Sequence, residues 1–125
     1  MTICVDFDGT IVKHCYPDIG EPIPGAVETL KWLAERGVKL ILYTMRSHPS
    51  DPTERDTLQE AMDWCKEQGI QFWAVNWNPG QSRWTNSKKV HCDWCIDDRN
   101  IGTPMNNGVL DWVRIRVILE KIVGA

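Results

Sequence analysis

The sequence lacks the features that would place it in several large classes of protein. Its 125 residues carry 14 Lys and Arg against 17 Asp and Glu, so it has no excess of positive charge for nonspecific nucleic-acid binding. No apolar run is long enough to span a bilayer, and an acid at position 6 interrupts any signal-peptide pattern. We therefore expect a cytoplasmic protein that does not bind membranes, although contact with a nucleic-acid end through a local patch remains open.

The cysteines also form no recognisable disulfide framework. There are five, an odd number, and we expect them to be reduced thiols, as in a cytoplasmic protein. Cys92 and Cys95 have C-x-x-C spacing, with His91 beside them. On a strand, residues i and i+3 point to opposite faces, and no second Cys/His pair has zinc-finger spacing. The spacing therefore predicts that the two thiols do not converge, and that this segment holds neither zinc nor a redox pair.

Alternating apolar and turn-rich segments predict one α/β domain over residues 1–125. A first helix is expected from Pro24 to just before Gly37, a second from residues 51–53 to Gly69, and a closing helix over 110–123. The predicted strands cover residues 2–5, 38–43, 71–75 and 94–96. This order predicts a minimal Rossmann-like parallel sheet of about four strands, in three layers with helices on both faces.

Polar side chains follow three of these strands. The first strand runs directly into the string Asp6-Phe7-Asp8-Gly9-Thr10, the second ends at Thr44, and the fourth runs into Asp97 and Asp98. Because the carboxyl ends of parallel strands meet at one edge, we expect these side chains to converge there. Four carboxylates in one cleft repel each other and favour a hard divalent cation such as Mg²⁺.

The string Asp6-Phe7-Asp8-Gly9-Thr10 resembles the first motif of the haloacid dehalogenase (HAD) superfamily of phosphatases and phosphotransferases. Thr44 is similar to the second motif of that family, a lysine before the last strand to the third, and Asp97-Asp98 to the fourth. The four motifs occur in the family's order and cover the chain from residue 3 to about residue 100. The resemblance therefore implies a HAD-like phosphoric monoester hydrolase.

The resemblance also implies a role for each matching residue. Asp6 would be the nucleophile that forms an aspartyl-phosphate, and Asp8 would be the general acid and base. The hydroxyl of Thr44 would hold phosphoryl oxygens. The Mg²⁺ site would consist of Asp6, the backbone carbonyl of Asp8, and Asp97 and Asp98, the last two binding directly or through water.

The lysine of the third motif has two candidates. Lys88 and Lys89 both precede the fourth strand, and either could add positive charge near the carboxylate edge and pair with Asp6 and the phosphate. We favour Lys89, because Ser87-Lys88 is typical of the start of a short helix whose next residue can turn inward.

The substrate would meet an open cleft. The segments that could hold a cap domain, after Val12 and before Lys88, are each about a dozen residues long, too short for a folded cap. The resemblance then implies a capless member that acts on a phosphorylated small molecule or on the phosphorylated end of a larger one, or one that forms a homo-oligomer that covers the cleft. Arg46 and Ser47 are candidates to bind the substrate phosphate, although a surface ion pair is the commoner fate of an arginine.

Other functions share part of this pattern. A phosphotransferase or a nucleic-acid end phosphatase would keep the same first step. A response-regulator receiver domain would carry an acceptor Asp after the third strand, where this chain reads Val75-Asn76-Trp77-Asn78. A catalytically silent HAD-like binding protein is the remaining alternative, and intact Asp6 and Asp8 argue against it.

Overall fold

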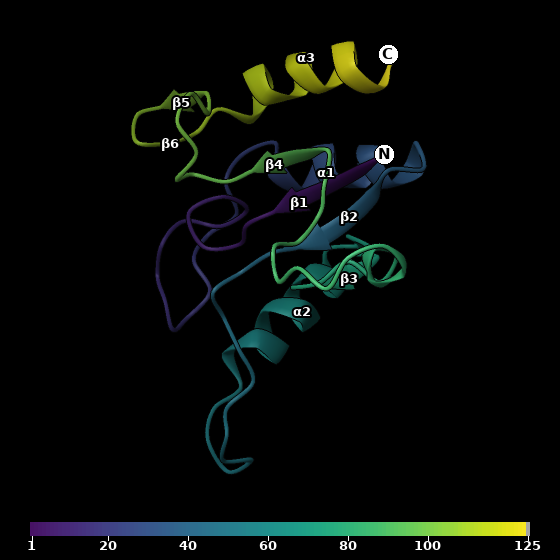
Figure 1. Ribbon diagram of the computed structural model, residues 1–125. Coiled ribbons are helices and arrows are strands. Elements are labelled where there is room, and N and C mark those ends of the chain that lie inside the picture. Colours follow the sequence, from purple (N-terminus) through teal and green to yellow (C-terminus); the bar gives the residue numbers. More distant parts are fainter. Residues whose placement is uncertain (125) are drawn as a thin grey trace.

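Four short parallel strands form the centre of the molecule (Figure 1). The computed structural model describes residues 1–124. The strands are β1 (Thr2–Val5), β2 (Lys39–Leu42), β3 (Ala74–Val75) and β4 (Trp94–Ile96), and they lie in the order β3-β2-β1-β4. In β1, Cys4 lies opposite Ile41 of β2 on one side and Cys95 of β4 on the other. The predicted α/β class and the four-stranded parallel sheet are confirmed.

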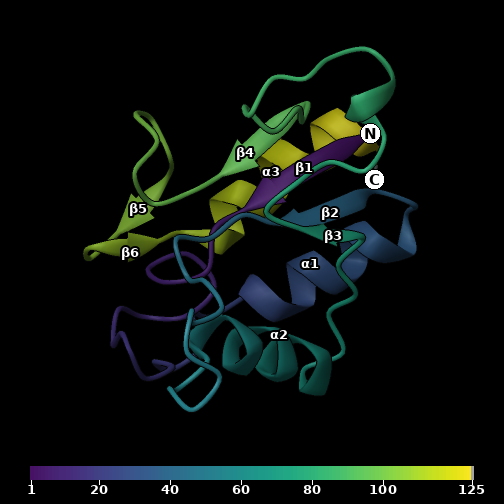
Figure 2. The ribbon, with the colours of Figure 1, turned by 60° about the horizontal axis from the view of Figure 1, so that its bottom comes forward.

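All three helices contribute to one core on the same face of this sheet. They are α1 (Ala26–Glu35), α2 (Thr57–Glu67) and α3 (Trp112–Val123), and α1 and α2 lie together below the sheet in Figure 2. Buried residues from each of the three helices form a single cluster with Ile3 and Val5 of β1. Because side chains alternate along a strand, Cys4 lies on the opposite face, where it packs with Ile41. Helices were predicted on both faces of the sheet, and the structure has them on one face only.

The second face is covered by the connection between β3 and β4, residues 76–93. Val90 and Cys92 of this connection pack against the small cluster on that face. Its one regular element is the short 3-10 helix η1 (Gln81–Arg83). A right-handed connection that returns from β3 across β2 and β1 to β4 has to pass over this face. A segment with an internal Pro79-Gly80 turn does so as a loop rather than as a helix.

The C-x-x-C thiols converge, and the prediction that they would not is wrong. Sγ of Cys92 lies 3.1 Å from Sγ of Cys95. The strand begins only at Trp94, so Cys92 belongs to the preceding loop and does not follow the alternation of a strand. The chain bends at Asp93, whose N–H donates to the Thr2 carbonyl (2.8 Å) and whose carboxylate accepts from the Thr2 N–H (2.8 Å).

The helix starts follow the capping side chains. Asp56 accepts a hydrogen bond from the Gln59 N–H (2.9 Å) and begins α2, later than the predicted start at residues 51–53. Asp51 instead accepts from the N–H of Thr53 (2.9 Å), which forms a local turn. Within residues 1–124, no helix combines the length and apolar character needed to cross a bilayer.

A hairpin between β4 and α3 was not predicted. Its strands, β5 (Met105–Asn106) and β6 (Val109–Leu110), are two residues each and pair antiparallel. Asn107 (φ 53°) and Gly108 (φ 80°) form the turn, and positive φ at both central residues is typical of an Asn-Gly hairpin. Strands this short carry no alternation that the sequence could have revealed.

Candidate active site

A cavity of ≈ 550 Å³ lies at the carboxyl edge of the sheet. Every strand of the sheet contributes to its lining through the residues that follow it. These include Asp6 and Asp8 after β1, Thr44 and Arg46 after β2, Asn76 after β3 and Asp97 after β4. The predicted convergence of the strand ends therefore places most of the predicted site residues around one space.

The three side chains predicted to bind the metal form a tight cluster. Carboxylate oxygens of Asp6, Asp97 and Asp98 lie within 4.8 Å of one another. The backbone fixes this arrangement, because the Asp6 N–H donates to the Ile96 carbonyl (3.0 Å) and extends the pairing of β1 with β4. Oxygen ligands from separate carboxylates at this spacing fit a hard divalent cation.

The charges in this cluster shift the pKa values of its members in different directions. Burial, together with the charge of Asp97, raises the pKa of Asp6 to about 7. Burial also raises the pKa of Asp97. Burial would raise the pKa of Asp98 too, but hydrogen bonds with His14 and the neighbouring acids outweigh it and lower that pKa. A cation at the cluster would stabilise all three carboxylates in their charged form.

Two further residues hold the acids in place. Thr10 is fully buried; its hydroxyl donates to Asp6 Oδ2 (3.1 Å) and accepts from the Asp98 N–H (3.1 Å). His14 Nε2 lies 2.9 Å from Asp98 Oδ2 and lines the cavity. Thr10 stands in the motif string, but no role followed from its position alone, and the sequence gives no signal for His14, an exposed loop residue. The signal for Thr10 is its spacing of four residues from the strand-terminal acid.

The glycine of the motif allows this close approach. Gly9 has φ 83°, a left-handed conformation that favours glycine, and a Cβ there would collide with the side chains of His14 and Asp98. A side chain at this position would therefore separate the turn after β1 from the acids after β4.

Arg46 binds Asp8 and not solvent. Its Nε donates to Asp8 Oδ2 (2.8 Å) and its Nη2 to Asp8 Oδ1 (2.9 Å), a bidentate pair. The remaining N–H groups donate to the carbonyls of Pro17 (3.3 Å), Asp18 (2.9 Å) and Thr57 (3.0 Å). A guanidinium has five N–H groups, and these contacts use all of them.

This arrangement corrects both predictions for Arg46, a surface ion pair and a contact with the substrate phosphate. The residue is 2% exposed, so it does not form a surface ion pair, and it has no N–H left for a substrate phosphate. The carbonyls of Pro17 and Asp18 come from a loop distant in sequence, which packs over the guanidinium. Nothing in the residues next to Arg46 predicts that contact. Ser47, the other predicted substrate residue after β2, is exposed and does not line the cavity.

Thr44 lies where a phosphoryl-binding hydroxyl is expected. Its N–H donates to Asn76 Oδ1 (2.8 Å), and its Oγ1 accepts from the Arg46 N–H (3.1 Å). The hydroxyl proton is therefore free to point into the cavity toward a ligand. Asn76, a residue missed in the sequence, adopts φ 58° at the end of β3 and so brings its amide beside Thr44.

Neither lysine reaches the cavity. Lys88 and Lys89 are exposed and lie before the amino end of β4, whereas the acids follow its carboxyl end. The segment is not helical: Ser87 Oγ accepts from the Lys89 N–H (3.1 Å), and the Lys89 carbonyl accepts from Gln81 Nε2 (2.9 Å). The expected positive charge at the carboxyl edge comes from Arg46 and Arg99.

The fold and the site define an α/β protein with an acid-lined cavity at the carboxyl edge of a parallel sheet. No protein-family model and no curated protein matches the sequence. A solved structure is similar, that of a conserved protein coded by a locus of Bacteroides thetaiotaomicron. It is 44% identical, with a TM-score of 0.78, and the match covers 98% of this chain and 91% of that chain. The chain belongs to the same family as that conserved protein.

Proposed function

We propose that the protein is a Mg²⁺-dependent phosphoric monoester hydrolase of the HAD type. The observation that carries the proposal is the cluster of Asp6, Asp97 and Asp98 at the edge where Asp8 and Thr44 also line the cavity. These residues match the motifs that suggested the HAD resemblance, and they come from three different strand ends. A strand that ended by chance in solvated acids would not require partners from two other strands.

The residues at the cluster fit a magnesium ion. Three carboxylate oxygens within 4.8 Å supply hard oxygen ligands, and water and a substrate phosphate would complete the shell. The raised pKa of Asp6 is what burial beside other acids produces when no cation balances them. Bound there, Mg²⁺ would neutralise charge on Asp6 and on the phosphoryl oxygens.

The side chains of the protein then carry out two displacements. A carboxylate oxygen of Asp6 attacks phosphorus, the bond from phosphorus to the substrate oxygen breaks, and Asp8 gives that oxygen a proton. Water next attacks the aspartyl-phosphate, Asp8 takes its proton, and the bond between Asp6 and phosphorus breaks. The hydroxyl of Thr44 donates to a phosphoryl oxygen in both steps. Positioning of this kind provides much of the catalysis in phosphoryl transfer.

The pair formed by Asp8 and Arg46 favours a second candidate function. Both oxygens of Asp8 accept hydrogen bonds from Arg46, so only their remaining lone pairs can exchange a proton with the substrate. A protein that binds a phosphorylated ligand without turnover would not need Asp8 to exchange a proton. We keep the binding protein as the alternative for this reason, alongside a phosphotransferase.

The proposal extends to the class of substrate. We propose a capless enzyme with an open cleft, which acts on a phosphorylated small molecule or on the phosphorylated end of a larger one. A homo-oligomer could cover the cleft. The five cysteines are all free, which agrees with a cytoplasmic location.

Hydrolysis of an aryl phosphate, measured with Mg²⁺ and with a chelator, tests the proposal. Turnover should require Mg²⁺ and should disappear in Asp6→Asn and Asp8→Asn. Asp63→Asn, which changes an exposed acid on α2, should retain it. Activity that survives Asp6→Asn would contradict the proposal. Saturable binding of phosphate with no turnover would select the binding protein, and turnover that rises with an added alcohol acceptor would select the phosphotransferase.

A further inference from the structure

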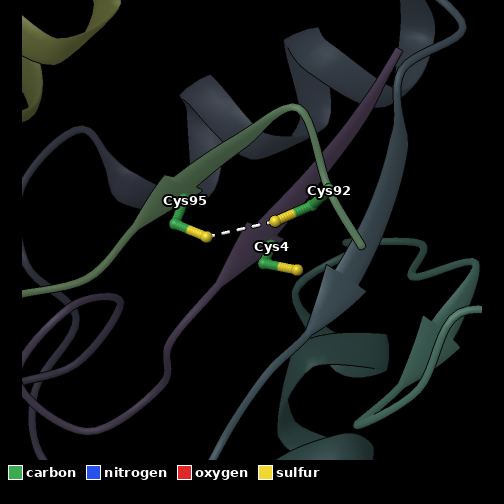
Figure 3. A group of neighbouring side chains, drawn as sticks. All are labelled: Cys4, Cys92 and Cys95. Atoms are coloured by element: carbon green, nitrogen blue, oxygen red, sulfur yellow. Dashed lines mark hydrogen bonds between the residues drawn. The ribbon is translucent and has the colours of Figure 1, made fainter. Parts of the chain in front are cut away.

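The second face of the sheet carries three thiols that the proposed hydrolase does not use. Cys4, Cys92 and Cys95 offer sulfur atoms that all lie within 4.8 Å of one another. Figure 3 shows Cys4 on β1, Cys95 on the neighbouring β4 and Cys92 on the loop that leads into β4. The other two cysteines, Cys15 and Cys65, lie outside this cluster.

The backbone brings these thiols together. Cys4 and Cys95 are partners in the register of two adjacent parallel strands, so their side chains leave the sheet on the same face. The clasp between Asp93 and Thr2 turns the chain immediately before β4 and sets Cys92 over that face. Two ligands therefore come from rigid strands and the third from an anchored loop, so the cluster forms as the sheet forms.

The surroundings suit a soft cation. Cys4 is 2% exposed and packs with Ile41 and Ala74, whereas Cys95 is open to solvent. An ion can thus enter past Cys95 and be held against an apolar wall. Thiolates select soft and borderline metals such as Zn²⁺, whereas the acids at the carboxyl edge suit Mg²⁺.

The three sulfurs are close enough together to share one zinc ion, since all lie within 4.8 Å of one another. Zn–S bonds of about 2.3 Å at tetrahedral angles place two sulfurs about 3.8 Å apart. Sγ of Cys92 and Sγ of Cys95, 3.1 Å apart, would separate slightly when both bind the ion. A disulfide between Cys92 and Cys95 is the rival use of two of these thiols, and it would leave Cys4 as a packing residue beside Ile41.

We propose that Cys4, Cys92 and Cys95 form a three-thiolate site for Zn²⁺, with a fourth position open to water or to a ligand from solvent. Binding replaces three S–H bonds by three Zn–S bonds and releases the three protons to solvent. Burial raises the pKa of Cys4 above its ordinary value, and it raises the pKa of Cys95 to about 11, so these two thiols keep their protons until a metal displaces them.

Titration of the reduced protein with Co²⁺, followed by displacement with Zn²⁺, tests this site. Thiolate-to-cobalt charge transfer gives a near-ultraviolet band that carboxylate ligands do not produce, so the readout separates this cluster from the acids. We expect one Co²⁺ per chain, displaced by one Zn²⁺. Cys92→Ser and Cys95→Ser should each weaken binding by more than the ~10-fold to 100-fold that loss of an outer partner costs.

Two controls make the result specific. Cys15→Ser removes an exposed cysteine outside the cluster and should leave the band unchanged. Asp6→Asn should also leave it unchanged, which separates this proposal from the hydrolase. Circular dichroism of Cys95→Ser, a change at an exposed position, should match the wild type.

Three outcomes would overturn the zinc site. One is the absence of a charge-transfer band in the reduced protein. Another is a loss of Co²⁺ binding in Cys15→Ser as large as that in Cys92→Ser and Cys95→Ser. The third is the formation of a disulfide between Cys92 and Cys95, with loss of two hydrogens, when a protein that binds no Co²⁺ is mildly oxidised. That result would assign the two thiols to a disulfide.

Discussion

The same two strands, β1 and β4, support two clusters of opposite chemistry. At their carboxyl ends Asp6 meets Asp97 and Asp98, and two residues earlier Cys4 lies in register with Cys95. The acids are hard ligands at the edge of a cavity of ≈ 550 Å³, whereas the thiols are soft ligands on the second face. The pairing of one strand with its neighbour therefore fixes both clusters, and the position along the strand decides which chemistry appears.

The largest expected effect separates the two clusters completely. Asp6→Asn removes the proposed nucleophile and should lower Mg²⁺-dependent turnover by about 10³-fold or more. Cobalt binding at the thiols should not change, because Asp6 is not one of its ligands. Cys95→Ser should show the reverse pattern in the same two assays. A loss of both properties in either variant would contradict two independent clusters.

The pair of Arg46 and Asp8 should be the strongest polar contribution to stability at the carboxyl edge. Arg46→Met leaves the Asp8 carboxylate and three backbone carbonyls without donors, which should cost about 3–5 kcal/mol in urea unfolding. Arg55→Met is the matched control, because Arg55 pairs with Glu60 at an exposed site. Its expected cost is much smaller, because exposed ion pairs contribute little to stability. Equal costs for the two variants would show that the buried pair has no special role.

Thr10→Val tests whether the hydroxyl orders the acids. The change keeps the branched shape but removes the donor to Asp6 and the acceptor for the Asp98 N–H. Mg²⁺ affinity should fall by about 10-fold, as for other partners that orient metal ligands. Calorimetric titration with Mg²⁺ measures this change. Unaltered affinity would mean that the backbone alone positions the carboxylates.

The most gradual expected effect is a pH dependence of stability in the presence of a chelator. Burial raises the pKa of Asp6 from its ordinary 3.8 to about 7, so the folded state holds this proton more tightly than the unfolded state. This contribution is fully present below pH 3.8 and is lost as pH rises toward 7. Relative to Asp6→Asn, the wild type should therefore lose stability over this window in urea unfolding. Added Mg²⁺ should reverse the loss, and a parallel pH course in both proteins would contradict it.

The sequence predicted the acidic cluster well because its residues terminate strands. Apolar runs locate β1 and β4, and the parallel sheet then brings Asp6 and Asp97 to one edge without any knowledge of side-chain packing. Arg46 could not be placed in this way, since three of its partners are carbonyls of Pro17, Asp18 and Thr57, which only the folded loops bring together.

The sequence-based prediction for the three thiols was wrong for a different reason. The alternation of side chains along a strand predicted that the Cys92 side chain points away from that of Cys95. This was wrong, because the strand begins two residues after Cys92 and the hydrogen bonds between Asp93 and Thr2 bend the chain. The prediction that a lysine lies in the site was wrong for a related reason. The connection that carries Lys88 and Lys89 crosses the second face as a loop, without the helix that would have turned a lysine inward. Element boundaries and loop contacts, rather than motifs, limited the prediction.

The most direct test of the proposed function is to trap the phosphoryl group on the protein. The chain is mixed with an aryl phosphate and Mg²⁺, quenched in acid, digested and analysed by mass spectrometry, with Asp8→Asn used to slow the second step. We predict one phosphoryl group on the peptide that contains Asp6, and none in Asp6→Asn. Phosphate release without a labelled Asp6, or a label on another residue, would contradict the assignment.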